Sequence, residues 1–150
     1  MYKKIFVAID DSPTSHKALS EAIHLAHASQ AALCIAHAAD EGLLAQHGMG
    51  LGSYINVEGT KQAIRDDAET LLAAARKQAS AAGLEAEIQL LEATDKRVAE
   101  LIASGAEAWG ADLIVVGTHG RRGVARLLVG SVAENLVRIA GTSLLMVRTS

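Results

Sequence analysis

The feature that most constrains the fold is a regular alternation of short apolar runs with longer amphipathic segments. Five runs have the length and the aliphatic character of strands, at residues 5–9, 32–36, 86–90, 113–116 and 143–148. The segments between them carry apolar residues at spacings of three and four, which is typical of helices that bury one face. Five strands separated by helices predict an α/β fold, with a parallel sheet covered by helices on both faces.

Several residues predict where helices begin and end. Ser12 followed by Pro13 is typical of an N-cap and the first helical position, so a helix should follow the first strand, with Asp11 starting the turn. Asp95 is expected to cap a later helix, and Gly110 to end it. The last helix is expected to hold Val132, Leu136, Val137 and Ala140.

Length and composition favour one domain over residues 1–150. Half of the residues are hydrophobic, enough for a sizeable core in a chain of this length. Residues 39–59 hold five glycines and are expected to form a long loop that is functional or mobile. No apolar run approaches the ~20 residues that span a bilayer, and the start is too short for a signal peptide, so we expect a cytoplasmic protein without membrane insertion.

Charge and cysteine content exclude some classes of site. Residues 1–116 carry a net charge of −7 and residues 117–150 a net charge of +4. An acidic body argues against general nucleic-acid binding, which needs a broad basic surface, whereas a compact basic segment fits a small anion or is a solvated patch. The single cysteine, Cys34, excludes an internal disulfide, and no metal site is predicted.

The segment after the fourth predicted strand carries the chemistry. Gly117, Gly120 and Gly130-Ser131 are spaced as Gly, two residues, Gly, nine residues, Gly-Ser. Glycines allow close approach of a ligand and positive φ, and a helix that begins at Ser131 offers free N–H groups to a phosphate. Arg121 and Arg122 add positive charge. These features together favour a phosphate-binding loop, although each alone is explained by a turn or a cap.

Other phosphate motifs do not fit. The chain contains no Walker-type P-loop, and the first strand is followed by Asp10-Asp11-Ser12-Pro13 instead of a dinucleotide fingerprint. Paired acids at this place also occur in phosphorylatable receiver domains. A receiver needs an aspartate after the third strand and a lysine after the fifth, where this chain has Glu92 and Arg148. The receiver interpretation is therefore rejected.

The residues Val115-Val116-Gly117-Thr118-His119-Gly120-Arg121-Arg122-Gly123, followed by Gly130-Ser131-Val132-Ala133-Glu134, form a specific signature. On this signature, and on Ile5 to Ser12 and Ile35 to Ala38, the whole chain resembles the single-domain, ATP-binding type of the universal stress protein family. The resemblance implies a doubly wound, Rossmann-like sheet in the order 3-2-1-4-5 and a dimer.

The resemblance also implies a site for ATP with Mg²⁺. Four residues would lie near adenine and ribose: Ala8, Ile9, Asp10 and Ala38. A second group would surround ribose and phosphates: Gly117, Thr118, His119, Gly120, Arg121, Arg122 and Gly123. The start of the last helix would hold the phosphates through Gly130, Ser131 and Val132.

The leading functional hypothesis is an ATP-binding regulatory protein of the stress response, whose output is binding and not turnover. One alternative is a slow ATPase or self-phosphorylating enzyme that uses Asp10 or His119. Another is a protein that binds an unidentified protein partner without nucleotide. The last strand, 143–148, is apolar on both faces and would lie at a sheet edge, so we expect a homodimer joined through it.

Overall fold

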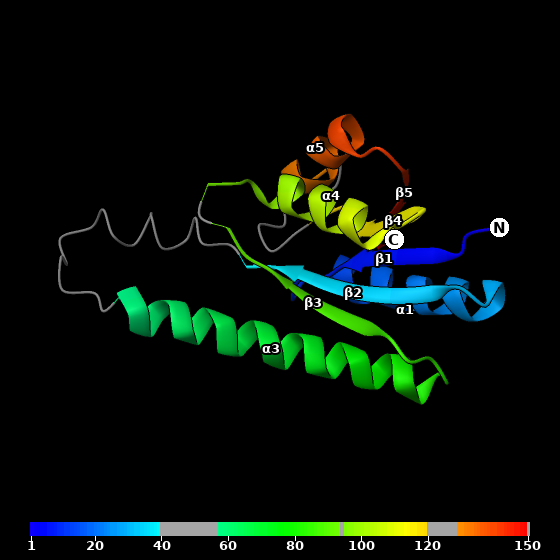
Figure 1. Ribbon diagram of the computed structural model, residues 1–150, viewed down its shortest axis with the longest axis horizontal. Helices are drawn as coiled ribbons and strands as arrows, with labels where there is room; N and C mark the ends of the chain where they lie inside the picture. The colour runs from blue at the N-terminus through cyan, green and yellow to red at the C-terminus, as the bar shows by residue number, and fades with distance from the viewer. Residues whose placement is uncertain (40–56, 94, 120–128, 150) are drawn as a thin grey trace.

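The computed structural model describes residues 1–39, 57–93, 95–119 and 129–149, which form a parallel sheet with helices on both sides (Figure 1). All strand pairs are parallel, in the order β3-β2-β1-β4-β5. The predicted α/β class and the strand order implied by the resemblance are confirmed. The elements are β1 (Lys4–Ala8), α1 (Pro13–Ser29), β2 (Ala32–Ala38), α3 (Val57–Ala81), β3 (Glu87–Leu91), α4 (Val98–Trp109), β4 (Leu113–Gly117), α5 (Ser131–Ile139) and β5 (Ser143–Val147).

The apolar residues of β1 contribute to two hydrophobic cores, one on each face of the sheet. Ile5 and Val7 belong to the apolar cluster under α1 and α3, whereas Phe6 and Ala8 belong to the cluster under α4 and α5. Successive residues of a strand point to opposite faces, so an uninterrupted apolar run is buried on both. Figure 1 shows α1 and α3 on one side of the sheet and α4 and α5 on the other.

The helix boundaries agree in part with the prediction. The Ser12 hydroxyl accepts the Ser15 amide at 3.2 Å, and Pro13 is the first residue of α1, as predicted. Gly110 ends α4 with a φ of 81°, also as predicted. The cap assigned to Asp95 is wrong, because α4 begins at Val98 with Arg97 at the N-cap position and no side-chain cap. Asp95 lies two residues before that position.

One further expectation needs correction. Helix α3 begins at Val57, so Gly59 lies inside a helix and not in the expected loop; residues 40–56 lie outside the described residues. In α5 the buried stripe includes Ala133 and Leu136. Val137 is 59% exposed and lies about 100° around the helix from Leu136.

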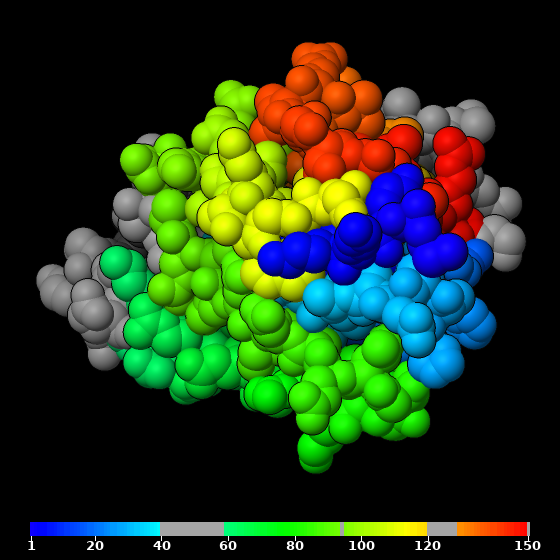
Figure 2. All heavy atoms as spheres, turned by 45° about the vertical axis from the view of Figure 1, so that its right-hand side comes forward, coloured from blue at the N-terminus to red at the C-terminus, as the bar shows by residue number. Residues whose placement is uncertain are grey.

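The amino edge of the sheet is closed by the start of the chain. In Figure 2 the first residues, in blue, lie between the end of α4, in yellow, and the start of β2, in cyan. The Lys3 carbonyl accepts the Ala32 amide and the Lys4 carbonyl accepts the Asp112 amide, each at 2.9 Å. A ligand site is therefore expected at the other end of the strands, where their carboxyl ends lie.

The topology defines a switch point at the carboxyl ends of β1 and β4. From β1 the chain adds β2 and β3 on one side, then crosses to add β4 and β5 on the other. In open α/β sheets, ligands bind outside the carboxyl ends of strands where the order reverses. Within the described parts of the chain, no helix has the length and apolar character of a membrane span.

Candidate functional site

The carboxyl end of β4 is tied directly to the start of α5. Thr118 follows Gly117, the last residue of β4, and its amide donates a hydrogen bond to the Val147 carbonyl at 2.9 Å. The Thr118 carbonyl accepts the Gly130 amide at 2.6 Å. Two segments that the sequence separates by about a dozen residues therefore meet at the switch point.

The start of α5 has the character of an anion site. Gly130 occupies the N-cap position and has no side chain to cap the first turn, so among the described residues the leading amides of α5, beginning at Ser131, have no side-chain cap. Ser131 is exposed and Val132 is half-buried. Uncapped N–H groups and the helix dipole favour a negatively charged group. Gly130 has a φ of −60°, so positive φ is not the reason for glycine here.

His119 is fixed at its carbonyl and at its ring. Its carbonyl accepts hydrogen bonds from the hydroxyls of Thr14 and, at 3.2 Å, of Ser12. Its Nδ1 shares a hydrogen bond of 3.0 Å with the Thr118 hydroxyl. Its Nε2 is buried and has no hydrogen-bond partner among the described residues. A buried polar atom of this kind is a rare feature and indicates a place where a partner can be added.

Gly117 is needed for a reason that the sequence did not reveal. A Cβ atom at this position would lie 2.6 Å from the Thr14 hydroxyl oxygen and 2.9 Å from the Thr14 carbonyl carbon. Gly117 therefore permits the first turn of α1 to approach β4. Its φ is not positive, and the close approach that it allows is to α1.

Asp10 stabilises the turn between β1 and α1. Its Oδ1 accepts the Ser12 amide at 2.8 Å, and its own amide donates to the Ser15 hydroxyl at 2.7 Å. The turn-forming role expected of Asp11 thus belongs to Asp10. Asp11 is exposed, and its Oδ1 lies 3.7 Å from Nε2 of His16. Asp10 is half-buried and lies just after the carboxyl end of β1.

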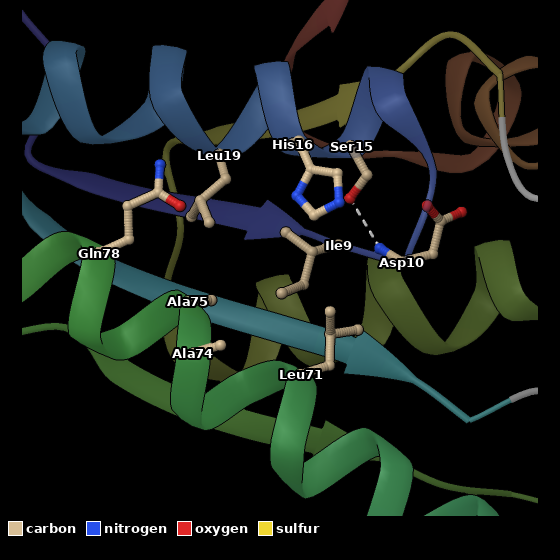
Figure 3. Close-up of a pocket in the computed structure, with 9 residues that line it drawn as sticks. All are labelled: Ile9, Asp10, Ser15, His16, Leu19, Leu71, Ala74, Ala75 and Gln78. Atoms are coloured by element: carbon tan, nitrogen blue, oxygen red, sulfur yellow. Dashed lines mark hydrogen bonds between the residues drawn. The ribbon is translucent and has the colours of Figure 1, made fainter.

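A cavity of about 80 Å³ lies beside Asp10, between α1 and α3 (Figure 3). Figure 3 shows side chains from both helices pointing into it. The lining residues are Ile9, Asp10, Ser15, His16, Leu19, Leu71, Ala74, Ala75 and Gln78.

The residues assigned to adenine are divided between the two faces of the sheet. Ile9 belongs to the cluster under α1 and α3, whereas Ala8 and Ala38 belong to the cluster under α4 and α5. All three are buried at the carboxyl ends of neighbouring strands. The buried His37 donates from Nδ1 to the Ile9 carbonyl at 2.7 Å.

The structure thus brings together Asp10, Gly117, Thr118, His119 and Gly130. Ser131 and Val132 follow Gly130 as the first two residues of α5. The hydroxyls of Ser12 and Thr14 join the group and were missed as site residues, because their sequence pattern indicates only a helix start. Of the basic segment, Arg138 forms an exposed pair with Glu134 at 3.2 Å and Arg148 is exposed directly after β5. Gly120, Arg121, Arg122 and Gly123 lie outside the described residues.

This fold defines a doubly wound α/β protein, with the candidate site at its switch point. Comparison with known proteins identifies the family within this fold class. The pattern of the Universal stress protein family matches residues 1–148, and the chain belongs to that family. It is 30% identical to the Universal stress protein YxiE of Bacillus subtilis, over 99% of this chain and 100% of that protein.

Solved structures agree with this assignment. A universal stress protein family structure from Burkholderia pseudomallei is 30% identical, with a TM-score of 0.78, and covers 97% of this chain and 96% of that one. A universal stress protein in complex with cAMP is also 30% identical, with a TM-score of 0.67 and 99% coverage of both chains.

Proposed function

We propose that this chain binds ATP at the carboxyl ends of β1 and β4 and acts as a nucleotide-dependent regulatory module. The observation that carries the proposal is the hydrogen bond from the Gly130 amide to the Thr118 carbonyl, which brings the uncapped start of α5 to the switch point. A similar protein of the same family binds cAMP, which supports an adenine nucleotide as the ligand.

We assign a part in nucleotide binding to several residues of the candidate site. The leading amides of α5 and the Ser131 hydroxyl donate to phosphate oxygens, as a helix N-terminus does for anions. The Asp10 carboxylate accepts from a ribose hydroxyl, and the buried Nε2 of His119 meets a polar atom of the nucleotide. Ala8, Ile9 and Ala38 provide apolar surface at the same edge. We propose that Gly120 to Gly123 complete the loop.

Mg²⁺ belongs to the proposal as the ion that ATP carries on its phosphates. Magnesium is commonly bound through substrate phosphates with few protein ligands, and the N–H and hydroxyl donors at α5 suit the phosphate oxygens that the metal leaves free. Binding is proposed as the output because the groups assigned to chemistry have structural partners. Oδ1 of Asp10 accepts the Ser12 amide, and Nδ1 of His119 is engaged by Thr118.

The test is a calorimetric titration of the purified chain with ATP, ADP, AMP and cAMP in the presence of Mg²⁺. ATP is expected to bind most tightly, because it offers the most phosphate oxygens to α5. Prolonged incubation with labelled ATP distinguishes binding from turnover. Release of phosphate, or labelling of the protein, that is lost in His119→Ala would favour the slow enzyme. Absence of binding by all four nucleotides would contradict the proposal.

A further inference from the structure

We infer that Thr14 is a positioning residue for the nucleotide site, an inference that rests on the function proposed above. Thr14 lies in the first turn of α1 and is only 4% exposed. Its hydroxyl donates to the carbonyl of His119, 105 residues further along the chain. The hydroxyl thus acts between two elements, whereas a helix cap acts within one.

Thr14 restrains the main chain on both sides of Thr118. On one side it packs against Gly117 so closely that a methyl group there would lie 2.9 Å from its Cβ. On the other side it holds the His119 carbonyl. Thr118 lies between these two contacts, and its carbonyl accepts the Gly130 amide at 2.6 Å. The position of Thr14 is therefore transmitted to the start of α5.

The same contacts orient the His119 ring. The ring is held at Nδ1 by the hydroxyl of Thr118, and the His119 main chain is held by Thr14. With these two restraints the direction of Nε2, which has no hydrogen-bond partner among the described residues, is fixed before a ligand arrives. Pre-ordering of a binding group reduces the entropy lost on binding. Thr14 would strengthen nucleotide binding in this way without touching the nucleotide.

Thr14 is also the better residue for a test than its neighbour Ser12. The Ser12 hydroxyl donates to the same carbonyl at 3.2 Å, but it also accepts the Ser15 amide as the N-cap of α1. A substitution of Ser12 would therefore weaken the helix and the site together.

The experiment compares Thr14→Val, which replaces the hydroxyl by a methyl group of similar shape, with Thr14→Ser, which retains the hydroxyl. Thr70→Val is the matched control, because the Thr70 hydroxyl donates to a backbone carbonyl, that of Asp66 at 2.9 Å, on the exposed face of α3. Affinity for ATP with Mg²⁺ is measured by calorimetry at a temperature where circular dichroism shows every variant folded. Thr14→Val is expected to bind roughly three- to tenfold more weakly, the range of one lost hydrogen bond. Thr14→Ser and Thr70→Val should bind like the unchanged chain.

Each outcome has a defined meaning. Unchanged affinity in Thr14→Val overturns the positioning role while nucleotide binding stands, whereas an unchanged chain that binds no adenine nucleotide overturns both proposals. If Thr14→Val does not fold, Thr14→Ser decides. If Thr14→Ser binds ATP with full affinity although its unfolding midpoint is lower, positioning by the hydroxyl is supported. If its ATP affinity and its stability fall together, the positioning role is overturned. The ring ¹⁵N resonances of His119 should shift in Thr14→Val and not in Thr70→Val; unchanged resonances overturn the role.

Discussion

Asp112 accepts the backbone amide of Lys3 at 2.8 Å through Oδ2, and thereby attaches the first residues of the chain to the turn before β4. Its Oδ1 accepts the Lys4 amide at 3.0 Å. Lys4 in turn donates from Nζ to the Trp109 carbonyl at 2.5 Å and lies 4.4 Å from the centroid of the Trp109 ring. The amino edge of the sheet is therefore closed by charged and polar contacts, at the end away from the proposed site.

The first prediction concerns acid stability. Burial tends to raise the pKa of Asp112, but the hydrogen bonds from the Lys3 and Lys4 amides outweigh it and hold the pKa below its ordinary value of 3.8. The stabilisation is complete above the ordinary pKa and is lost as the pH falls through the lower folded pKa. Urea unfolding between about pH 3 and pH 7 should show a shallower loss of stability in acid for Asp112→Asn than for the unchanged chain. Asp95→Asn, at an exposed aspartate, is the control, and identical slopes for all three would contradict the prediction.

The second prediction concerns Cys34, in the middle of β2. Its residue is completely buried, and burial, with a smaller contribution from the charge of Glu87, raises the pKa of the thiol to about 12. The thiolate is the reactive form, so the folded chain should resist iodoacetamide near neutral pH. Mass spectrometry should find one label per chain after unfolding in urea, because the sequence has a single cysteine. Rapid labelling of the folded protein would show that the strand opens.

The third prediction concerns the contact between β4 and α1. Gly117→Ala places a methyl group 2.6 Å from Oγ1 of Thr14 and 2.9 Å from its backbone carbonyl carbon, so the main chain must shift. Overpacking of this kind destabilises proteins by about 1–3 kcal/mol. Gly141→Ala is the matched control, since a Cβ there has no atom within 4 Å. Equal free energies of unfolding for the two variants in urea would show that α1 yields without cost.

Gly117 and Thr14 also illustrate what a single sequence can and cannot predict. The strands, the Ser12 cap and the Gly110 helix end were predicted because each depends on residues that are near one another in the chain. The contact of Thr14 with His119 joins residues 105 positions apart, and the local pattern around Thr14 indicates only the start of a helix. The sequence marked Gly117 for a ligand, whereas the close contact that requires glycine is with α1. The cap predicted at Asp95 was wrong for a local reason. Asp95 lies three positions before the first residue of α4, and a sequence pattern does not fix the first residue of a helix to better than a few positions.

The fourth prediction concerns the start of α5. Gly130 has backbone angles that other residues adopt, so Gly130→Val should fold, but its branched side chain should block the approach of phosphate to the leading amides. ATP affinity measured by calorimetry should fall by at least about tenfold, as expected when several charge-assisted hydrogen bonds are lost. Gly141→Val, at an exposed glycine, should bind ATP normally. Normal binding by Gly130→Val would place the phosphates elsewhere.

The last prediction concerns β5, an edge strand of the sheet that pairs with β4. Met146 is 36% exposed, and Leu144 and Leu145 are only half-buried, so β5 presents an apolar edge. Such an edge favours association, and a twofold copy of the same strand is the commonest partner. We therefore expect a homodimer joined through β5.

Two lysine substitutions at opposite edges of the sheet test this assembly. Met146→Lys places a charge on β5 and should give monomers or loss of solubility, because an edge lysine prevents strand association. Ile88→Lys changes a residue of similar exposure, 38%, on β3 at the other edge, and should leave the dimer intact. Light scattering at micromolar concentration measures the mass of each. A monomer mass for the unchanged chain would contradict the dimer, and dissociation by Ile88→Lys alone would move the interface to β3.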